Sequence, residues 1–113
     1  MAVYSDLSID QGADFLAEIV VEDATGTVAD LTGFTGAGQI RKSYSSSTAV
    51  DFNVVIDPAT VTQGLVVLKL SNTVTNGMKA GRYVYDVEIT KTSNGEKTRV
   101  VEGQVTINPG VTQ

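Results

Sequence analysis

Short stretches in which apolar and polar residues alternate, separated by turn residues, run along the whole chain. The clearest covers residues 50–56, where valine, phenylalanine, valine and isoleucine occupy every second position. Because successive side chains of a β-strand point to opposite faces, a period of two predicts a strand with one buried face. The same reasoning predicts strands over residues 3–9, 15–22, 28–31 leading into 34–42, 50–56, 65–70, 82–90 and 97–107.

Turn residues punctuate these runs. Gly26 and Pro58 each follow a predicted strand, and Asn94-Gly95, between the last two strands, is a strong signal for a tight hairpin. After residue 70 the alternation breaks, and Ser71 is predicted to cap a single helical turn that Gly77 keeps short.

The number and spacing of these runs predict the architecture. About seven short strands and no helix of normal length are typical of an antiparallel all-β sandwich. The sequence shows no internal repeat and no linker, so we expect one domain over residues 1–113. Residues 1–10 and 108–113 are expected to be flexible arms that become ordered on a neighbouring molecule.

One predicted strand carries a more specific signal. In an immunoglobulin-type sandwich, a tyrosine two residues before the second core position bonds back to the backbone at a corner between the sheets. The motif Gly81-x-Tyr83-x-Tyr85 reproduces this layout, with Tyr85 where an antibody domain has cysteine. The alternative is that both tyrosines are simply core residues on one strand face. The corner interpretation predicts an immunoglobulin-like sandwich, and neither interpretation is catalytic.

Composition excludes several classes of function. The 113 residues include no cysteine and no histidine, which removes disulfides, thiolate nucleophiles, Cys-ligated zinc and the usual base near neutral pH. The net charge is −5 and the eight basic residues are scattered, which argues against nucleic-acid binding. No apolar run approaches the roughly 20 residues that span a bilayer, and no signal-peptide pattern opens the chain. We expect a soluble protein that is not an enzyme.

The glycine-rich stretch Gly33-x-x-Gly36-x-Gly38 has two interpretations. A phosphate cradle needs a helix N-terminus immediately after it, whereas residues 39–42 continue as a strand. Close backbone packing at a strand crossing is therefore the prediction.

Thirteen carboxylates leave room for a metal site or a glycosidase-type acid pair. Asp6, Asp10 and Asp14 recur every four residues, and Glu22-Asp23 lies beside a turn. Calcium loops place oxygen ligands at alternating positions and close with a bidentate carboxylate, a spacing found nowhere in this sequence. These groups are expected to be solvated charges that keep a strand edge from pairing, with no metal or cofactor bound.

Several apolar residues are predicted to point to the strand face opposite to that of the core residues. A sheet with one wet face normally alternates more cleanly, so such leftover positions are compatible with a buried protein interface. Bulges and register errors produce the same pattern. As an interface, these residues would let the domain self-associate or dock on a lattice. The candidate interface residues are Leu16, Val20, Leu65, Val67, Val84 and Val100.

Two pairs of motifs occur in a definite order along the chain. They are Asp30-Leu31-Thr32-Gly33-Phe34 with Gln39-Ile40-Arg41-Lys42, and Ala80-Gly81-Arg82-Tyr83-Val84-Tyr85-Asp86-Val87-Glu88 with Val101-Glu102-Gly103-Gln104-Val105-Thr106-Ile107. Their order and spacing resemble the immunoglobulin-like N-terminal domain of tailed-phage baseplate upper proteins, and small structural proteins of cyanophage-type virions, over roughly residues 7–112. The resemblance implies a virion structural protein and supplies no catalytic residues.

In the baseplate family this domain opens a longer polypeptide, whereas this chain ends just after Pro109. We therefore expect a capsid cement, decoration or adaptor subunit or a tail or baseplate component, made in the host cytoplasm and incorporated into the virion. Its partners would be other virion proteins, in a homo-oligomer or on a lattice, and neither nucleic acid nor membrane.

Two rival functions stay open. The first is a carbohydrate- or cell-surface-binding immunoglobulin-like module, which the absence of tryptophan and the total of seven aromatic residues disfavour. The second is an enzyme that uses carboxylates alone.

Overall fold

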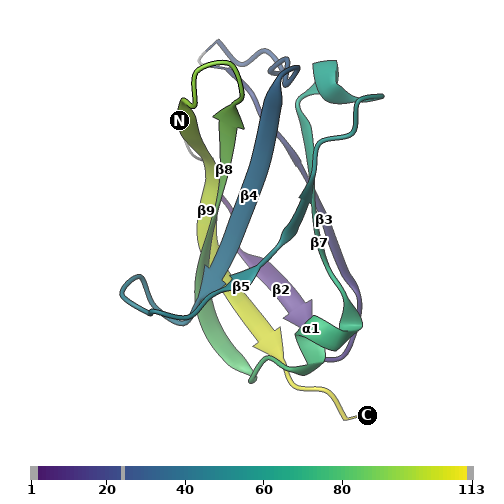
Figure 1. Cartoon of the computed structure of the whole chain (residues 1–113). Helices are drawn as coiled ribbons and strands as arrows, with labels where there is room; N and C mark the ends of the chain where they lie inside the picture. Colours follow the sequence, from purple (N-terminus) through teal and green to yellow (C-terminus); the bar gives the residue numbers. More distant parts are fainter. Residues whose placement is uncertain (1–2, 24, 112–113) are drawn as a thin grey trace.

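The computed structural model describes residues 3–23 and 25–111, which form two β-sheets packed face to face (Figure 1). These residues hold nine strands, one short helix α1 (Asn72–Asn76) and one 3-10 turn η1 (Val61–Gln63). The strands are β1 (Val3–Tyr4), β2 (Leu7–Asp10), β3 (Phe15–Val20), β4 (Phe34–Arg41), β5 (Val50–Asp51), β6 (Asn53–Val55), β7 (Leu65–Leu70), β8 (Gly81–Lys91) and β9 (Lys97–Asn108).

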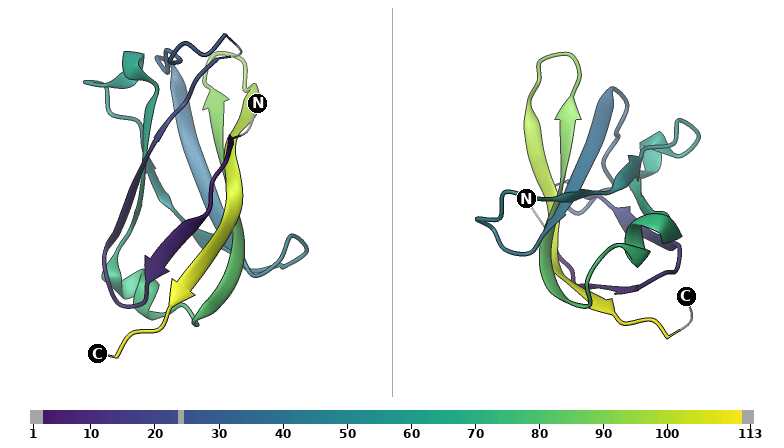
Figure 2. Two further views of the ribbon diagram at one scale, coloured as in Figure 1. Left: turned by 180° about the vertical axis from the view of Figure 1, so that it is seen from behind. Right: turned by 60° about the horizontal axis from the view of Figure 1, so that its bottom comes forward.

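The strand order is that of an immunoglobulin-like sandwich. The six-stranded sheet has the order β1–β9–β8–β4–β5, with β2 also on β9, and the three-stranded sheet has the order β3–β7–β6. In immunoglobulin lettering the smaller sheet corresponds to strands B, E and D, and β4, β8 and β9 to C, F and G. The predicted fold class is confirmed. One pairing departs from the antiparallel expectation, because β1 and β2 run parallel to β9 (Figure 2, left).

The run at residues 50–56 is two strands instead of the predicted one. β5 pairs with β4 in the larger sheet, and β6 pairs with β7 in the smaller sheet, so the chain changes sheet at Phe52. The Phe52 side chain is buried between the sheets, and its ring packs edge-on against Tyr85 at 6.0 Å between centroids. The alternation correctly predicts extended chain in this run, but it does not reveal that β5 and β6 pair with different sheets.

The glycines of β4 make this change of sheet possible. A Cβ on Gly36 would lie 2.5 Å from Val54 Cγ1, and one on Gly38 would lie 3.2 Å from the Phe52 ring. The crossing segment therefore packs directly on the backbone of β4, and the predicted close packing at a strand crossing is confirmed.

The hydrophobic core fills the space between the sheets. Fully burying a valine, leucine or isoleucine side chain contributes about 1.5–3 kcal/mol. Alternation of apolar residues along each strand is therefore enough to specify which face of the strand points inward. The apolar residues with at most 1% exposure come from both sheets and from the loop before β4: Ile9, Leu31, Ile40, Val66, Leu68, Val87, Val101, Val105 and Ile107.

The N-terminal arm predicted over residues 1–10 is wrong from Val3 onward. β2 pairs with β9 along four residues, and the Ile9 side chain is completely buried. The prediction of an arm failed because the apolar residues of this segment pair with those of a strand almost a hundred residues away. At the other end, Val111 is almost fully exposed, and residues 112–113 lie outside the described residues.

Residues 28–31 are not a strand as predicted, since only Val28 forms an isolated bridge, with Glu22. The helical turn is confirmed, because Ser71 Oγ accepts a hydrogen bond from the Val74 amide and α1 ends at Gly77. The Asn94-Gly95 turn joins β8 to β9, as predicted. Within the described residues, no helix is long and apolar enough to cross a bilayer.

Candidate functional site

The structure divides the six candidate interface residues among three places. Leu16 and Val20 of β3 lie with Leu65 and Val67 of β7 on the outer face of the three-stranded sheet. Val84 is half-buried on the outer face of the other sheet, and Val100 is in the core.

The outer face of the three-stranded sheet is built by the pairing of β3, β7 and β6. Val20 pairs with Leu65 across the β3–β7 ladder, and Val67 pairs with Val55 across the β7–β6 ladder. Paired side chains on one face lie about 4.5–5.5 Å apart at Cβ, so these residues adjoin one another. Leu16 is 58% exposed and Val20 51% exposed. The outer apolar face is defined here as Leu16, Val20, Val55, Leu65 and Val67.

Val55 is the member that sequence reasoning missed. It follows the clean alternation of residues 50–54 at a position that the pattern reserves for polar side chains. The sequence did contain a signal for Val55, because it is an apolar residue at a position where the alternation expects a polar one. The same signal identified its neighbours as candidate interface residues. In β6, Val55 pairs with Val67 of β7, whose partner on the other side is Glu18 of β3.

Two charged residues lie among these apolar side chains, and a hollow opens at one end of the face. Lys69 lies between Leu16 on β3 and Asn53 on β6, and Glu18 lies beside Val67. A hollow of about 580 Å³ opens at this end of the sheet, lined in part by Leu16, Lys69 and Val74. Such a hollow has room for a projecting side chain of a partner molecule.

Val100 does not belong to an interface, contrary to the prediction. The β8–β9 register shifts after Val87, so that Val87 pairs with Val101 whereas Glu88 pairs with Arg99. Val100 is the extra residue of this β-bulge, and a bulge changes which face the following side chains point to. Val100 and Val101 consequently both face the core, where Val100 is 5% exposed.

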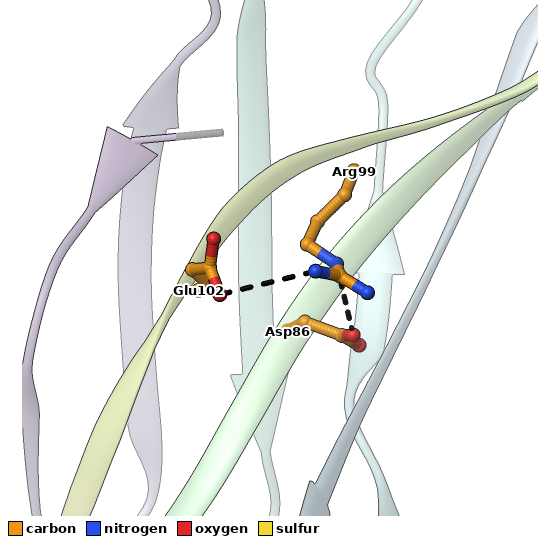
Figure 3. A network of polar contacts seen from close by, with 3 residues as sticks. All are labelled: Asp86, Arg99 and Glu102. Atoms are coloured by element: carbon orange, nitrogen blue, oxygen red, sulfur yellow. Dashed lines mark ion pairs between the residues drawn. The ribbon is translucent and has the colours of Figure 1, made fainter. Parts of the chain in front are cut away.

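Val84 lines a separate hollow of about 290 Å³ on the outer face of the six-stranded sheet. An ionic network spans the same hollow (Figure 3). Arg99 Nε lies 3.3 Å from Asp86 Oδ2, and Arg99 NH1 lies 3.9 Å from Glu102 Oε1. The three side chains come from β8 and β9, which the bulge beside Val100 brings into this register.

The predicted corner residues lie where β8 begins. The Tyr83 hydroxyl donates to the Lys79 carbonyl at 2.7 Å, which is the bond back to the backbone that a tyrosine corner makes. Gly81 has φ of +143°, a conformation that side chains rarely adopt, and the Lys42 ammonium lies 4.7 Å from the centre of the Tyr83 ring. These contacts hold the corner and offer no reactive group.

Tyr85 is tied to the N-terminal strands. Its hydroxyl donates to the Ser5 carbonyl at 2.5 Å, and burial raises its pKa to about 12. The Ser5 amide in turn donates to the Glu102 carbonyl, so this segment is bonded to both β8 and β9.

The aspartates that recur every four residues stabilise the fold. Asp6 accepts a hydrogen bond from the Gln104 amide, Asp10 accepts one from the Asn108 side chain, and Asp14 accepts one from the Asn72 amide. The expectation that they keep an edge from pairing is wrong for Asp6 and Asp10, which help to join the N-terminal segment to β9.

The other acidic candidate, Asp23, closes its own turn. Hydrogen bonds from the Thr25 side chain and from the Thr25 and Thr27 amides lower the pKa of its carboxyl. Among the described residues, no group of three or more acidic side chains is placed to hold a metal ion.

Comparison with known proteins gives a likeness of fold. No protein-family model matches the chain, and no curated protein matches it. CopC from Methylosinus trichosporium OB3b is 13% identical, with a TM-score of 0.52 over 95% of this chain and 89% of that chain. The filamin domain of Lin-41 is 14% identical, with a TM-score of 0.47 over 91% of this chain and 84% of that domain.

InlP from Listeria monocytogenes is 13% identical, with a TM-score of 0.49 over 95% of this chain. This chain spans 28% of the length of InlP. At such identities the comparisons bear on the fold alone, and CopC supports the sandwich architecture described above.

Proposed function

We propose that this chain is a non-enzymatic structural subunit of a phage virion that binds another virion protein through the outer apolar face. The observation that carries the proposal is the exposure of Leu16 and Val20, each more than half exposed, on the same sheet face as three further apolar side chains. Removing apolar surface from water contributes roughly 25 cal/mol per Å², so covering this face favours association.

The edge of the smaller sheet supports the same role. Among the described residues, β3 pairs with β7 and has no strand on its other side. An open edge can accept an extended segment of another chain, which adds main-chain hydrogen bonds to the apolar contact. A partner segment alongside β3 would lie next to Leu16, Glu18 and Val20, and a basic residue in that segment would complement Glu18.

The roles of the side chains that could act as acids, bases or nucleophiles support a function without catalysis. The chain has no histidine or cysteine, and the carboxylates of Asp6, Asp14 and Asp23 already accept hydrogen bonds from backbone amides. A carboxylate used in this way stabilises a turn or a strand junction and is poorly placed to act as an acid or a base.

The phage setting rests on the sequence resemblance. The motifs at residues 30–34 and 39–42 form the entry to β4 and β4 itself, and those at residues 80–88 and 101–107 form β8 and β9. These three strands are neighbours in the six-stranded sheet. The motifs that carry the resemblance therefore lie in one contiguous half of the sandwich, and the outer apolar face lies on the other sheet.

The proposal is tested in the phage whose genome encodes this chain. Mass spectrometry of purified particles should find the protein in many copies. A double variant, Leu16→Glu with Val20→Lys, places charges on the outer apolar face at exposed positions without changing the net charge, so it should fold but be lost from particles.

The matched control places the same two charges on the opposite sheet. Thr35→Lys with Thr106→Glu alters exposed residues of β4 and β9 and should be incorporated at the wild-type level. Absence of the chain from wild-type particles would overturn the phage role. Normal incorporation of the Leu16→Glu, Val20→Lys variant would overturn the assigned interface.

A further inference from the structure

The outer face of the six-stranded sheet carries a polar groove that the proposed function does not use. The hollow beside Val84 shares Gln39 and Asp86 with a second hollow of about 440 Å³, which extends over Gly36 and reaches Glu88. Because a strand rises about 3.3 Å per residue, the joined hollows extend roughly 17 Å from Gly36 to Arg41 along β4.

Two exposed tyrosines lie at one end of the groove. Tyr44, in the loop after β4, lines the first hollow and is 82% exposed. Tyr4, on β1, pairs with Glu102, which lines the same hollow, and is 64% exposed. Desolvation, and then the Asp6 carboxylate beside the hydroxyl, raise the pKa of Tyr4.

The polar side chains of the groove bond to one another and to the loop that carries Tyr44. Arg41 donates to Gln39 Oε1 at 2.9 Å and to the Ser46 carbonyl at 2.6 Å, so it ties the Tyr44 loop to the sheet. Gln39 donates to Asp51 Oδ1 at 2.9 Å, and Arg99 bridges Asp86 and Glu102 as Figure 3 shows. A site held in this way loses little conformational freedom when a ligand binds.

The charge of the groove selects the class of ligand. Two guanidinium groups, Arg41 and Arg99, face four carboxylates, those of Asp51, Asp86, Glu88 and Glu102. An anionic ligand would meet an excess of negative charge. A hydroxyl both donates and accepts, so neighbouring carboxylate and guanidinium groups can each bond to the same neutral polyol.

We propose that this groove binds a neutral oligosaccharide, with Tyr44 stacking on the C–H face of a sugar ring and Gln39, Asp86 and Arg99 bonding to its hydroxyls. Val84 provides the apolar floor under the ring. The length of the groove suits several linked sugars better than one. A polysaccharide at the surface of a cell is a source of such a ligand, and this contact would act separately from the outer apolar face.

The test is binding of the purified full chain to an array of neutral hexose oligosaccharides of increasing length, with uronic-acid and sulfated counterparts on the same array. Neutral oligosaccharides should bind and the anionic ones should not. Titration calorimetry with the best neutral oligosaccharide should show affinity about tenfold weaker for Tyr44→Ala, the effect of losing one stacking contact. Asp86→Asn should weaken it as well.

Two controls separate this site from the proposed docking role. The Leu16→Glu, Val20→Lys variant should bind the saccharide like the wild type, and thermal unfolding of Tyr44→Ala should match the wild type because the side chain is exposed. Failure of every neutral oligosaccharide to bind, preference for anionic saccharides, or unchanged affinity of Tyr44→Ala would each overturn the saccharide site and leave the docking proposal standing. Binding of an extended peptide in place of saccharides would do the same.

Discussion

Gly103 and Tyr85 are direct partners across the β8–β9 ladder, and the Ser5 backbone occupies the space that a side chain at Gly103 would need. The Tyr85 hydroxyl reaches into the same space and donates to the Ser5 carbonyl. The pair therefore couples the N-terminal segment to the sheet that carries the polar groove. Because β1 and β2 pair with β9 alone among the described strands, this junction holds their register.

Gly103→Ala should loosen the N-terminal segment. The added Cβ collides with the Ser5 carbonyl, which is backbone and cannot rotate away, so we expect a loss of roughly 1–3 kcal/mol in unfolding free energy. Urea denaturation measures the loss, and hydrogen exchange should show faster exchange over residues 5–10.

The matched control is Gly77→Ala. Gly77 has φ of −81°, and its nearest neighbour would lie 3.5 Å from the added Cβ, so this variant should be as stable as the wild type or slightly more so. Equal stabilities of Gly103→Ala and Gly77→Ala would contradict the role given to Gly103.

Tyr85 should make stability depend on alkaline pH. Its pKa is raised to about 12 in the folded protein, chiefly by burial, whereas an unfolded tyrosine titrates near pH 10. The unfolded state therefore loses its proton first, so the stabilisation is complete below pH 10 and is lost as pH rises toward 12. Urea unfolding across this range should show the decline, and Tyr85→Phe should reduce its slope. The same slope in both proteins would contradict this assignment.

The alternation of residues predicted where most strands lie, but it could not predict how they are joined. Residues 50–54 alternate without a break, yet Phe52 marks a change of sheet that depends on the two glycines opposite it in β4. The parallel pairing of β2 with β9 was missed for a similar reason. A local period of two fixes which side chains share a face and contains no information about a distant partner.

The candidate site was predicted in part. Leu16, Val20, Leu65 and Val67 lie on one face because β3 and β7 keep regular alternation along their whole length. Val100 was misplaced because one extra residue in β9 shifts the alternation, and a bulge produces the same off-face apolar residue in the sequence as an interface does. The groove around Tyr44 could not be foreseen, since its residues come from β4, β8, β9 and a loop that only the folded chain brings together.

The stability cost of truncating Val100, in the core, can be compared directly with that of truncating Val84, on the outer face of the same sheet. Val100→Ala should cost roughly 2 kcal/mol, because it opens space in a closed core, whereas Val84→Ala on the outer face should cost less than about 1 kcal/mol. Chemical denaturation of the two variants measures both values. A larger loss for Val84→Ala would contradict the placement of the bulge.

Assembly through the outer apolar face would also cover Lys69, whose exposed side chain lies between Leu16 and Asn53 on the same sheet face. The most direct measurement is acylation of lysines followed by mass spectrometry, on the isolated protein and on purified particles, with Lys91 and Lys97 at the β8–β9 hairpin as internal references. Lys69 should react readily in the isolated protein and become strongly protected in particles, relative to the two references. Equal reactivity of Lys69 in both samples would contradict assembly through this face.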